Sequence, residues 1–203
     1  VEKAQRHALA GEKVLFLCYN SQLKNYLSEN YAHENIHYYT ISGYACRLCD
    51  LTTPNYAKMQ VKLEDMYVFG TFPYDHIVID EGQDFGIDDV EEANIIETLK
   101  SIIEDTKPDT SSFYIFYDKL QLIQSSQVPK YIEEADCKLT LYRNCRNTEN
   151  IATTSLAPIT ERTPKLIDGC IKGAPAKLHF CADEAAVREK LNLLLETLKG
   201  QGV

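Results

Sequence analysis

Two adjacent carboxylates, Asp80 and Glu81, follow a short apolar run at Ile77–Ile79. The run is rich in β-branched residues and too short for a helix, so it predicts a strand that is buried on both faces. In open α/β sheets ligands bind beyond the carboxyl ends of the strands, where two carboxylates suit a hydrated Mg²⁺ and a water molecule that needs activation. The alternative is a strand followed by a solvated acidic turn, and the pair alone does not separate these interpretations.

A sheet would position the acidic pair, because other stretches of the chain also have the composition of strands. They lie at 14–18, 36–41, 112–117 and 138–141 and are rich in β-branched, aromatic or other apolar residues. Segments typical of helices separate them, at 1–10, 21–30, 42–49, 58–68 and from 88 to 103, with Ser42 as the expected N-cap of the third. This alternation predicts an α/β fold with a parallel, doubly wound sheet.

Polar residues follow several of the predicted strands. In a parallel sheet the carboxyl ends lie at one edge, and a nucleotide would bind there. The residues at these ends are Asn20, Asp80, Glu81, Asp118, Arg143 and Asn144.

The composition bounds the class of protein. The 203 residues are 44% hydrophobic and 25% charged, which is ordinary for a globular protein of one domain or one domain and part of another. No apolar run approaches the length of a membrane span and no basic-then-apolar leader opens the chain, so we expect a cytoplasmic protein with no membrane partner. The net charge of −9 argues against a protein that coats DNA through its charge, although a motor that stacks on single-stranded bases is compatible with it.

The metal-binding residue types show no clear ligand spacing. The seven cysteines are scattered, and the Cys46/Cys49 pair has no second pair at a zinc-ribbon distance. A metal or redox role for this pair stands beside buried, reduced thiols on a helix. The five histidines have no ligand spacing either.

The acidic pair belongs to a longer phrase, Ile77-Val78-Ile79-Asp80-Glu81-Gly82-Gln83-Asp84-Phe85, which resembles motif II (the Walker B segment) of superfamily 1 helicases of the UvrD/Rep/PcrA type. Further segments resemble other motifs of this family, in the family's order. They are 15–20 (motif Ia), 40–46 (the segment that follows it), 114–121 (motif III) and 141–148 (motif IV). The resemblance covers nearly the whole chain and implies a truncated, RecA-like sheet of the P-loop NTPase type.

The resemblance implies ATP and Mg²⁺ as cofactors and assigns roles at an ATP site. Asp80 would hold Mg²⁺, and Glu81 would position and activate the attacking water. Gln83 would belong to the same site. Gln121 and Arg146 would contact the γ-phosphate and take part in catalysis, the arginine by neutralising charge that develops during transfer.

The resemblance also implies single-stranded or partly duplex DNA as a partner, with Tyr19, Asn20 and Ser42 close to the tracked strand. Two departures from the family's pattern concern this partner. Ile41 and Ser42 stand where the family usually has an aromatic residue and a histidine, and residues 122–124 lack the aromatic residue that commonly stacks on a base.

The chain contains no G-x-x-x-x-G-K-[S/T] sequence, and the family places this P-loop just before the helix at 1–10. We therefore expect a fragment of a DNA helicase or translocase that binds ATP weakly and hydrolyses little by itself. Residues 1–147 would form the first motor domain, with a small accessory insertion at 50–73 outside the core layers. Residues 148–203 would form a connector and the beginning of a second RecA-like domain, with a strand at 177–181 and a helix at 183–199. The alternative is a degenerate, non-catalytic helicase-like module that binds nucleic acid or protein.

Overall fold

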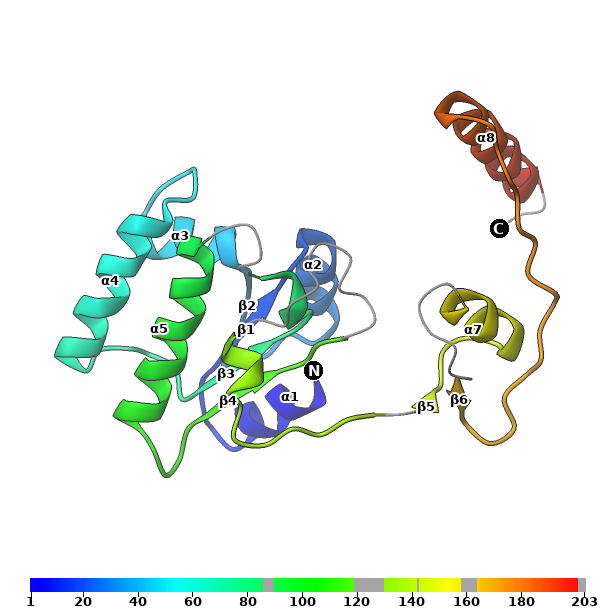
Figure 1. Cartoon of the computed structure of the whole chain (residues 1–203). Coiled ribbons are helices and arrows are strands. Elements are labelled where there is room, and N and C mark those ends of the chain that lie inside the picture. The colour runs from blue at the N-terminus through cyan, green and yellow to red at the C-terminus, as the bar shows by residue number, and fades with distance from the viewer. Residues whose placement is uncertain (86–89, 119–129, 142, 158–163, 201–203) are drawn as a thin grey trace. The chain divides into compact units, whose positions relative to one another are not determined.

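The computed structural model describes residues 1–85, 90–118, 130–141, 143–157 and 164–200. The chain forms two compact units, Val1–Lys138 and Leu139–Val203 (Figure 1). None of the helices that the structure describes is long and apolar enough to cross a membrane. The division after residue 147 into two motor domains stays a prediction.

A four-stranded parallel sheet is the centre of the first unit. The strands are β1 (Val14–Cys18), β2 (Ile36–Thr40), β3 (His76–Ile79) and β4 (Ser112–Ile115), in the order β2-β1-β3-β4. The ends of the strands are in register, with Leu17 of β1 opposite Ile79 of β3, and Ile79 opposite Ile115 of β4. The predicted α/β class and parallel sheet are confirmed.

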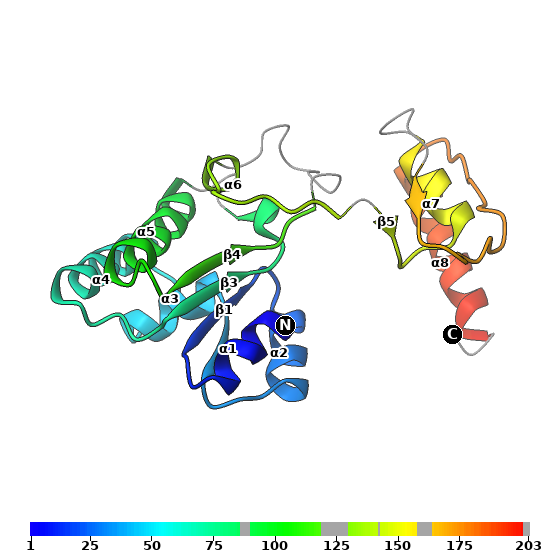
Figure 2. The same ribbon diagram turned by 90° about the horizontal axis from the view of Figure 1, so that it is seen from below.

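Helices cover both faces of this sheet, because successive side chains of a strand point to opposite faces. In β1, Leu15 and Leu17 pack with α3 (Ile41–Cys49), α4 (Tyr56–Phe69) and α5 (Val90–Thr106). Phe16 of the same strand packs with α1 (Glu2–Leu9) and α2 (Ser21–Asn30) on the other face (Figure 2). The described part of this unit also contains the 3₁₀ turn η1 (Gly82–Asp84) and the short helix α6 (Lys130–Glu133).

The position of α4 corrects the expectation that 50–73 lies outside the core layers. Met59 and Leu63 of α4 are fully buried in the same apolar cluster as Leu99 and Ile102 of α5 and Ile77 of β3. The sequence of this region is punctuated by Pro54, Gly70 and Pro73, but burial of its helix is decided by contact with α5, which no local signal encodes.

The second unit is small and exposed. β5 (Arg143–Asn144) pairs in parallel with β6 (Lys165–Leu166), and the helices are α7 (Glu149–Leu156) and α8 (Glu184–Gly200). The strands expected at 138–141 and 177–181 do not form, and these residues are exposed and irregular. The helix expected at 183–199 is present, but its apolar residues, such as Leu191 at 53% exposure, are not buried. A strand needs a paired neighbour and a covering layer, and among the described residues the segments 138–141 and 177–181 have neither.

The burial of α4 predicts the effect of truncating its side chains. Leu63→Ala should lower the free energy of unfolding by about 2–5 kcal/mol, since it removes a fully buried side chain from the core. Val61→Ala on the exposed side of the same helix should change it by no more than about 0.5 kcal/mol. Urea unfolding of both variants checks this, and equal stabilities would show that α4 does not contribute to the core.

Candidate active site

The acidic pair lies at the carboxyl end of β3, where the chain leaves the sheet. Ile79 still accepts a hydrogen bond from the Phe116 N–H (2.9 Å), and the Asp80 N–H donates to the Leu17 carbonyl oxygen of β1 (3.0 Å). The next residue, Glu81, has a φ of 57° in the left-handed region. The predicted transition from strand to loop therefore occurs at the acidic pair itself.

Glu81 has an uncommon backbone conformation, and the surrounding hydrogen bonds hold it there. A non-glycine residue in the left-handed region carries strain, which persists only where neighbouring contacts determine the conformation. The Glu81 carbonyl accepts from the Asp84 N–H (3.0 Å), and the Gly82 N–H donates to the Phe116 carbonyl (2.9 Å). The side chain of Glu81 accepts a hydrogen bond from Gln83 Nε2 at its Oε2 atom (2.7 Å).

Gln83 connects the end of β3 to the segment that follows β4. Its side chain is only 1% exposed, and Oε1 of its amide accepts a hydrogen bond from the Asp118 N–H (3.0 Å). The amide therefore uses its donor on Glu81 and its acceptor on Asp118, and it orients the Glu81 carboxylate. Gln83 was expected in the ATP site. In the structure it is buried and hydrogen-bonds to the Glu81 carboxylate.

The loop after the acidic pair is packed against two other parts of the unit. A Cβ atom at Gly82 would lie 2.3 Å from Cγ2 of Ile115, so only glycine fits there without displacing the Ile115 side chain. The hydroxyl of Tyr131 lies 3.0 Å from the Gly82 carbonyl oxygen and 2.8 Å from that of Phe85. Tyr131 was missed by the sequence analysis, because it is far from Gly82 along the chain and belongs to no motif.

Negative charge accumulates at this edge. Burial raises the pKa of Asp80, and the neighbouring charge of Glu81 raises it further. Burial and the charge of Glu81 also raise the pKa of Asp84. Burial raises the pKa of the Cys18 thiol to about 12, with Asp80 adding to the effect.

Such a cluster fits a divalent cation, because carboxylate oxygens are the ligands that Mg²⁺ prefers and its charge would offset the repulsion. Among the residues that the structure describes, the carboxylates at this edge do not bring three oxygens within ligand distance of one another. Mg²⁺ usually keeps several waters and uses one or two carboxylates, so the donor set suits this ion.

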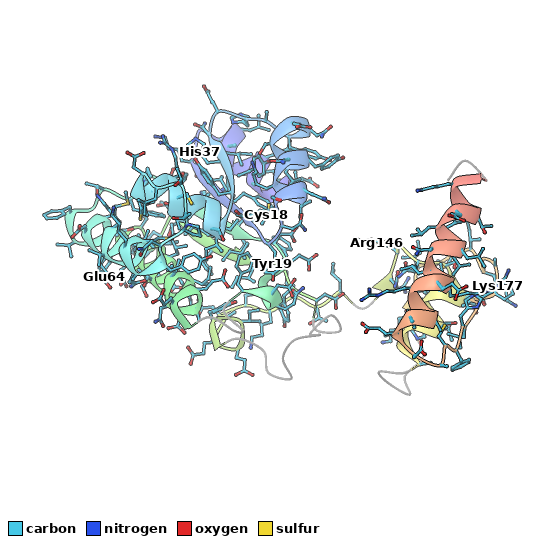
Figure 3. The ribbon with its side chains drawn as sticks, turned by 90° about the horizontal axis from the view of Figure 1, so that it is seen from above. Cys18, Tyr19, His37, Glu64, Arg146 and Lys177 are labelled. Atoms are coloured by element: carbon cyan, nitrogen blue, oxygen red, sulfur yellow. The ribbon has the colours of Figure 1, made fainter. Side chains whose placement is uncertain are left out.

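Tyr19 lies at the same edge, where β1 ends (Figure 3), and Asn20 follows it in the sequence. Tyr19 is 45% exposed as a residue, and its ring meets the Phe85 ring edge-on, with 5.7 Å between centroids. Asn20 is the N-cap of α2, and its Oδ1 accepts a hydrogen bond from the Leu23 N–H (2.7 Å).

Ser42 is not the N-cap that the sequence predicted. Thr40 caps α3, with its Oγ1 accepting from the Gly43 N–H (3.0 Å), so the cap lies two residues earlier than expected and the helix begins at Ile41. A threonine at the end of a strand satisfies this helix terminus as well as a serine would. The Ser42 hydroxyl instead lies 2.9 Å from the Tyr56 hydroxyl and connects α3 to α4.

The two residues expected at the γ-phosphate, Gln121 and Arg146, do not belong to the described part of the first unit. Gln121 lies outside the described residues. Arg146 belongs to the second unit, where its side chain is exposed and its N–H donates to Asn144 Oδ1 (3.0 Å). Arg143 is engaged elsewhere, in an ion pair with Asp168 (3.1 Å).

The raised pKa of Asp80 predicts a pH-dependent stability. A carboxyl with a pKa raised by folding destabilises the folded state once it ionises, so its cost is absent at low pH and present at pH 7. Asp80→Asn should therefore be more stable than the wild type at pH 7, and the difference should shrink as the pH falls toward about 4. Urea unfolding over this pH range checks it, with Asp65→Asn on the exposed side of α4 as the control. A variant less stable than the wild type at pH 7 would contradict this account.

The Tyr131 hydroxyl should support the loop that carries the acidic pair. Tyr131→Phe keeps the buried ring but removes the donor to the Gly82 and Phe85 carbonyls, which should lower the free energy of unfolding by about 1–2 kcal/mol. Tyr26→Phe, at a ring that is 55% exposed, should have no comparable effect. Chemical unfolding distinguishes the two, and equal changes would remove this role from Tyr131.

Comparison with protein-family models finds no match for this sequence, and neither does comparison with curated proteins. The interpretation of the site therefore depends on its residues and their geometry. The acidic pair, its buried glutamine support and Tyr19 come together at the carboxyl edge of the sheet, in the first unit of the chain.

Proposed function

We propose that this chain is part of an ATP-dependent DNA helicase or translocase of the UvrD-like group, with a RecA-like first motor domain. The observation that carries the proposal is the pair Asp80 and Glu81 at the carboxyl end of a central parallel strand, with Gln83 fixing the Glu81 carboxylate. The resemblance to motif II and the order of the other motifs give this geometry a specific chemical meaning.

The residues of this edge would divide the work of phosphoryl transfer. Asp80 would hold Mg²⁺ directly or through water, and the burial and the neighbouring Glu81 charge that raise its pKa would be offset by the cation. Glu81 accepts the proton of the attacking water. Gln83 donates to one oxygen of Glu81, which leaves the other oxygen to take this proton. When bound, ATP would supply the transferable phosphoryl group, and Mg²⁺ would neutralise its charge.

Contact between Tyr19 and Phe85 offers a route between an ATP site and a DNA site. Phe85 ends the motif II phrase, and its buried ring meets the exposed Tyr19 edge-on. An exposed tyrosine can stack on a base of single-stranded DNA. A shift of the loop at Gly82–Phe85 during hydrolysis would thus move the ring that contacts DNA. Asn20 would shape the loop between β1 and α2, which carries Tyr19, by capping α2. Ser42 of α3 would lie close to the DNA strand.

The remaining parts of the ATP site would come from elsewhere. Gln121 and Arg146 would contact the γ-phosphate, in keeping with motifs III and IV. The backbone amides and lysine of a P-loop are absent from this sequence, so a longer protein would supply them. We therefore place the activity in that longer protein.

The test is ATP hydrolysis by the complete protein, with and without single-stranded DNA, beside its Glu81→Gln variant. DNA should stimulate the wild type, and the variant should lose about 10²-fold or more of the turnover while it still binds ATP, because the amide cannot accept the proton. Glu29→Gln, an exposed residue of α2, should leave the turnover unchanged.

Absence of hydrolysis with and without DNA would overturn the motor function. If the complete protein then still bound single-stranded DNA or a protein partner, the chain would be a degenerate, non-catalytic helicase-like module. Full turnover in Glu81→Gln would leave an ATPase but remove Glu81 as its base.

A further inference from the structure

Three side chains meet at the amino-terminal edge of the sheet, at the opposite end of β3 from the acidic pair. They are His7 of α1, Glu12 of the turn that follows α1, and His76, the first residue of β3. His7 Nδ1 lies 2.6 Å from Glu12 Oε2, and His76 Nε2 lies 2.9 Å from the same oxygen. The histidines show no ligand spacing along the sequence, because folding brings His76 to this place from a distant segment.

The geometry of the group is that of converging metal ligands. One ligand atom from each residue lies within 4.8 Å of the other two. The three residues are therefore close enough to hold one metal ion. The imidazole rings are stacked, with 3.6 Å between centroids, and one nitrogen of each ring lies within hydrogen-bond distance of the same Glu12 oxygen. Zinc bonds of about 2.0–2.2 Å place tetrahedral ligand atoms about 3.3 Å apart. To share a metal ion, the Glu12 oxygen would therefore need to lie about 0.7 Å farther from His7 Nδ1 and about 0.4 Å farther from His76 Nε2.

Burial and a supporting hydrogen bond orient the two rings. The His76 side chain is 2% exposed, and its Nδ1 lies 2.7 Å from Ser112 Oγ of β4. Such a bond from the second ring nitrogen is the usual way in which a metal-binding histidine is held. His7 Nε2 is buried without a hydrogen-bond partner in the described part of the chain, so Nδ1 alone makes the polar contact of this ring. Glu12 is 39% exposed, which gives solvent access and freedom to move.

The charge of the group suits a cation. A hydrogen bond from His7 is the largest of the effects that together lower the pKa of Glu12, and burial lowers the pKa of His76. Imidazole nitrogens and carboxylate oxygens are both ligands that zinc binds in proteins. The nearby Asp75 is already engaged by Lys107 and by the Lys13 N–H.

We propose that His7, Glu12 and His76 bind one Zn²⁺ ion, through Nδ1, a carboxylate oxygen and Nε2, with water in the fourth position. Two imidazoles and one carboxylate are a common zinc ligand set. The ion clamps α1 and its following turn to the first residue of β3. The site is independent of the ATP chemistry proposed for the opposite edge of the sheet.

The experiment uses the full 203-residue chain, with Co²⁺ as a spectroscopic probe and Zn²⁺ as a competitor. One Co²⁺ should bind per chain with visible d–d bands and without the intense near-ultraviolet band of thiolate ligands, which excludes the cysteines. Zn²⁺ should displace it. A hundredfold excess of Zn²⁺ over its Kd should raise Tm by about 5 °C or more.

Variants assign the ligands. Glu12→Gln, at a partly exposed position, and His7→Gln should each weaken binding at least about tenfold and remove the Zn²⁺-dependent rise in Tm. The exposed His179→Ala should bind as the wild type does. Circular dichroism establishes that each variant is folded. No binding by the wild type, or binding as tight as that of the wild type in both Glu12→Gln and His7→Gln, would overturn the proposal and leave the three residues as a hydrogen-bonded cluster.

Discussion

Burial of β3 on both faces is the constraint on which the first unit depends. Ile77 and Ile79 pack toward α3, α4 and α5, whereas Val78 packs toward α1 and α2. Parallel pairing with β1 and β4 leaves this strand no edge exposed to solvent. Since the strand cannot slip without moving apolar side chains into the wrong layer, its two ends are fixed. His76 is therefore held at one edge of the sheet, and Asp80 at the other.

At the carboxyl edge, the structure holds charge and backbone strain that an isolated loop would lose. Asp80 is partly buried beside a second carboxylate, and Glu81 adopts a left-handed conformation. Gln83 and Tyr131 offset these costs, one by bonding the Glu81 side chain and the other by bonding the loop carbonyls. Strain and uncompensated charge that are supported in this way are typical of sites at which a ligand completes the interactions.

Local pattern predicted much of the first unit because its strands are short, apolar and bounded by helices with clear periodicity. The same signals failed where burial depended on a distant partner. The helix at 56–69 looked peripheral, yet Leu63 is in the core because α5 lies beside it. Residues 138–141 and 177–181 have strand composition, but no neighbouring strand pairs with them in the described structure. The helix at 184–200 formed as expected without covering its apolar side.

The sequence by itself determined the α/β class, the parallel sheet and the place of the acidic pair at a strand end, because strand and helix periods and turn residues are local properties. Only the tertiary structure decided which side chains support or join these positions. The bond between Gln83 and Asp118, the bond between Tyr131 and Gly82, and the meeting of His7 with His76 each join residues from separate elements. Such contacts depend on the packing of whole layers, which has no signature in the spacing of residues along the chain.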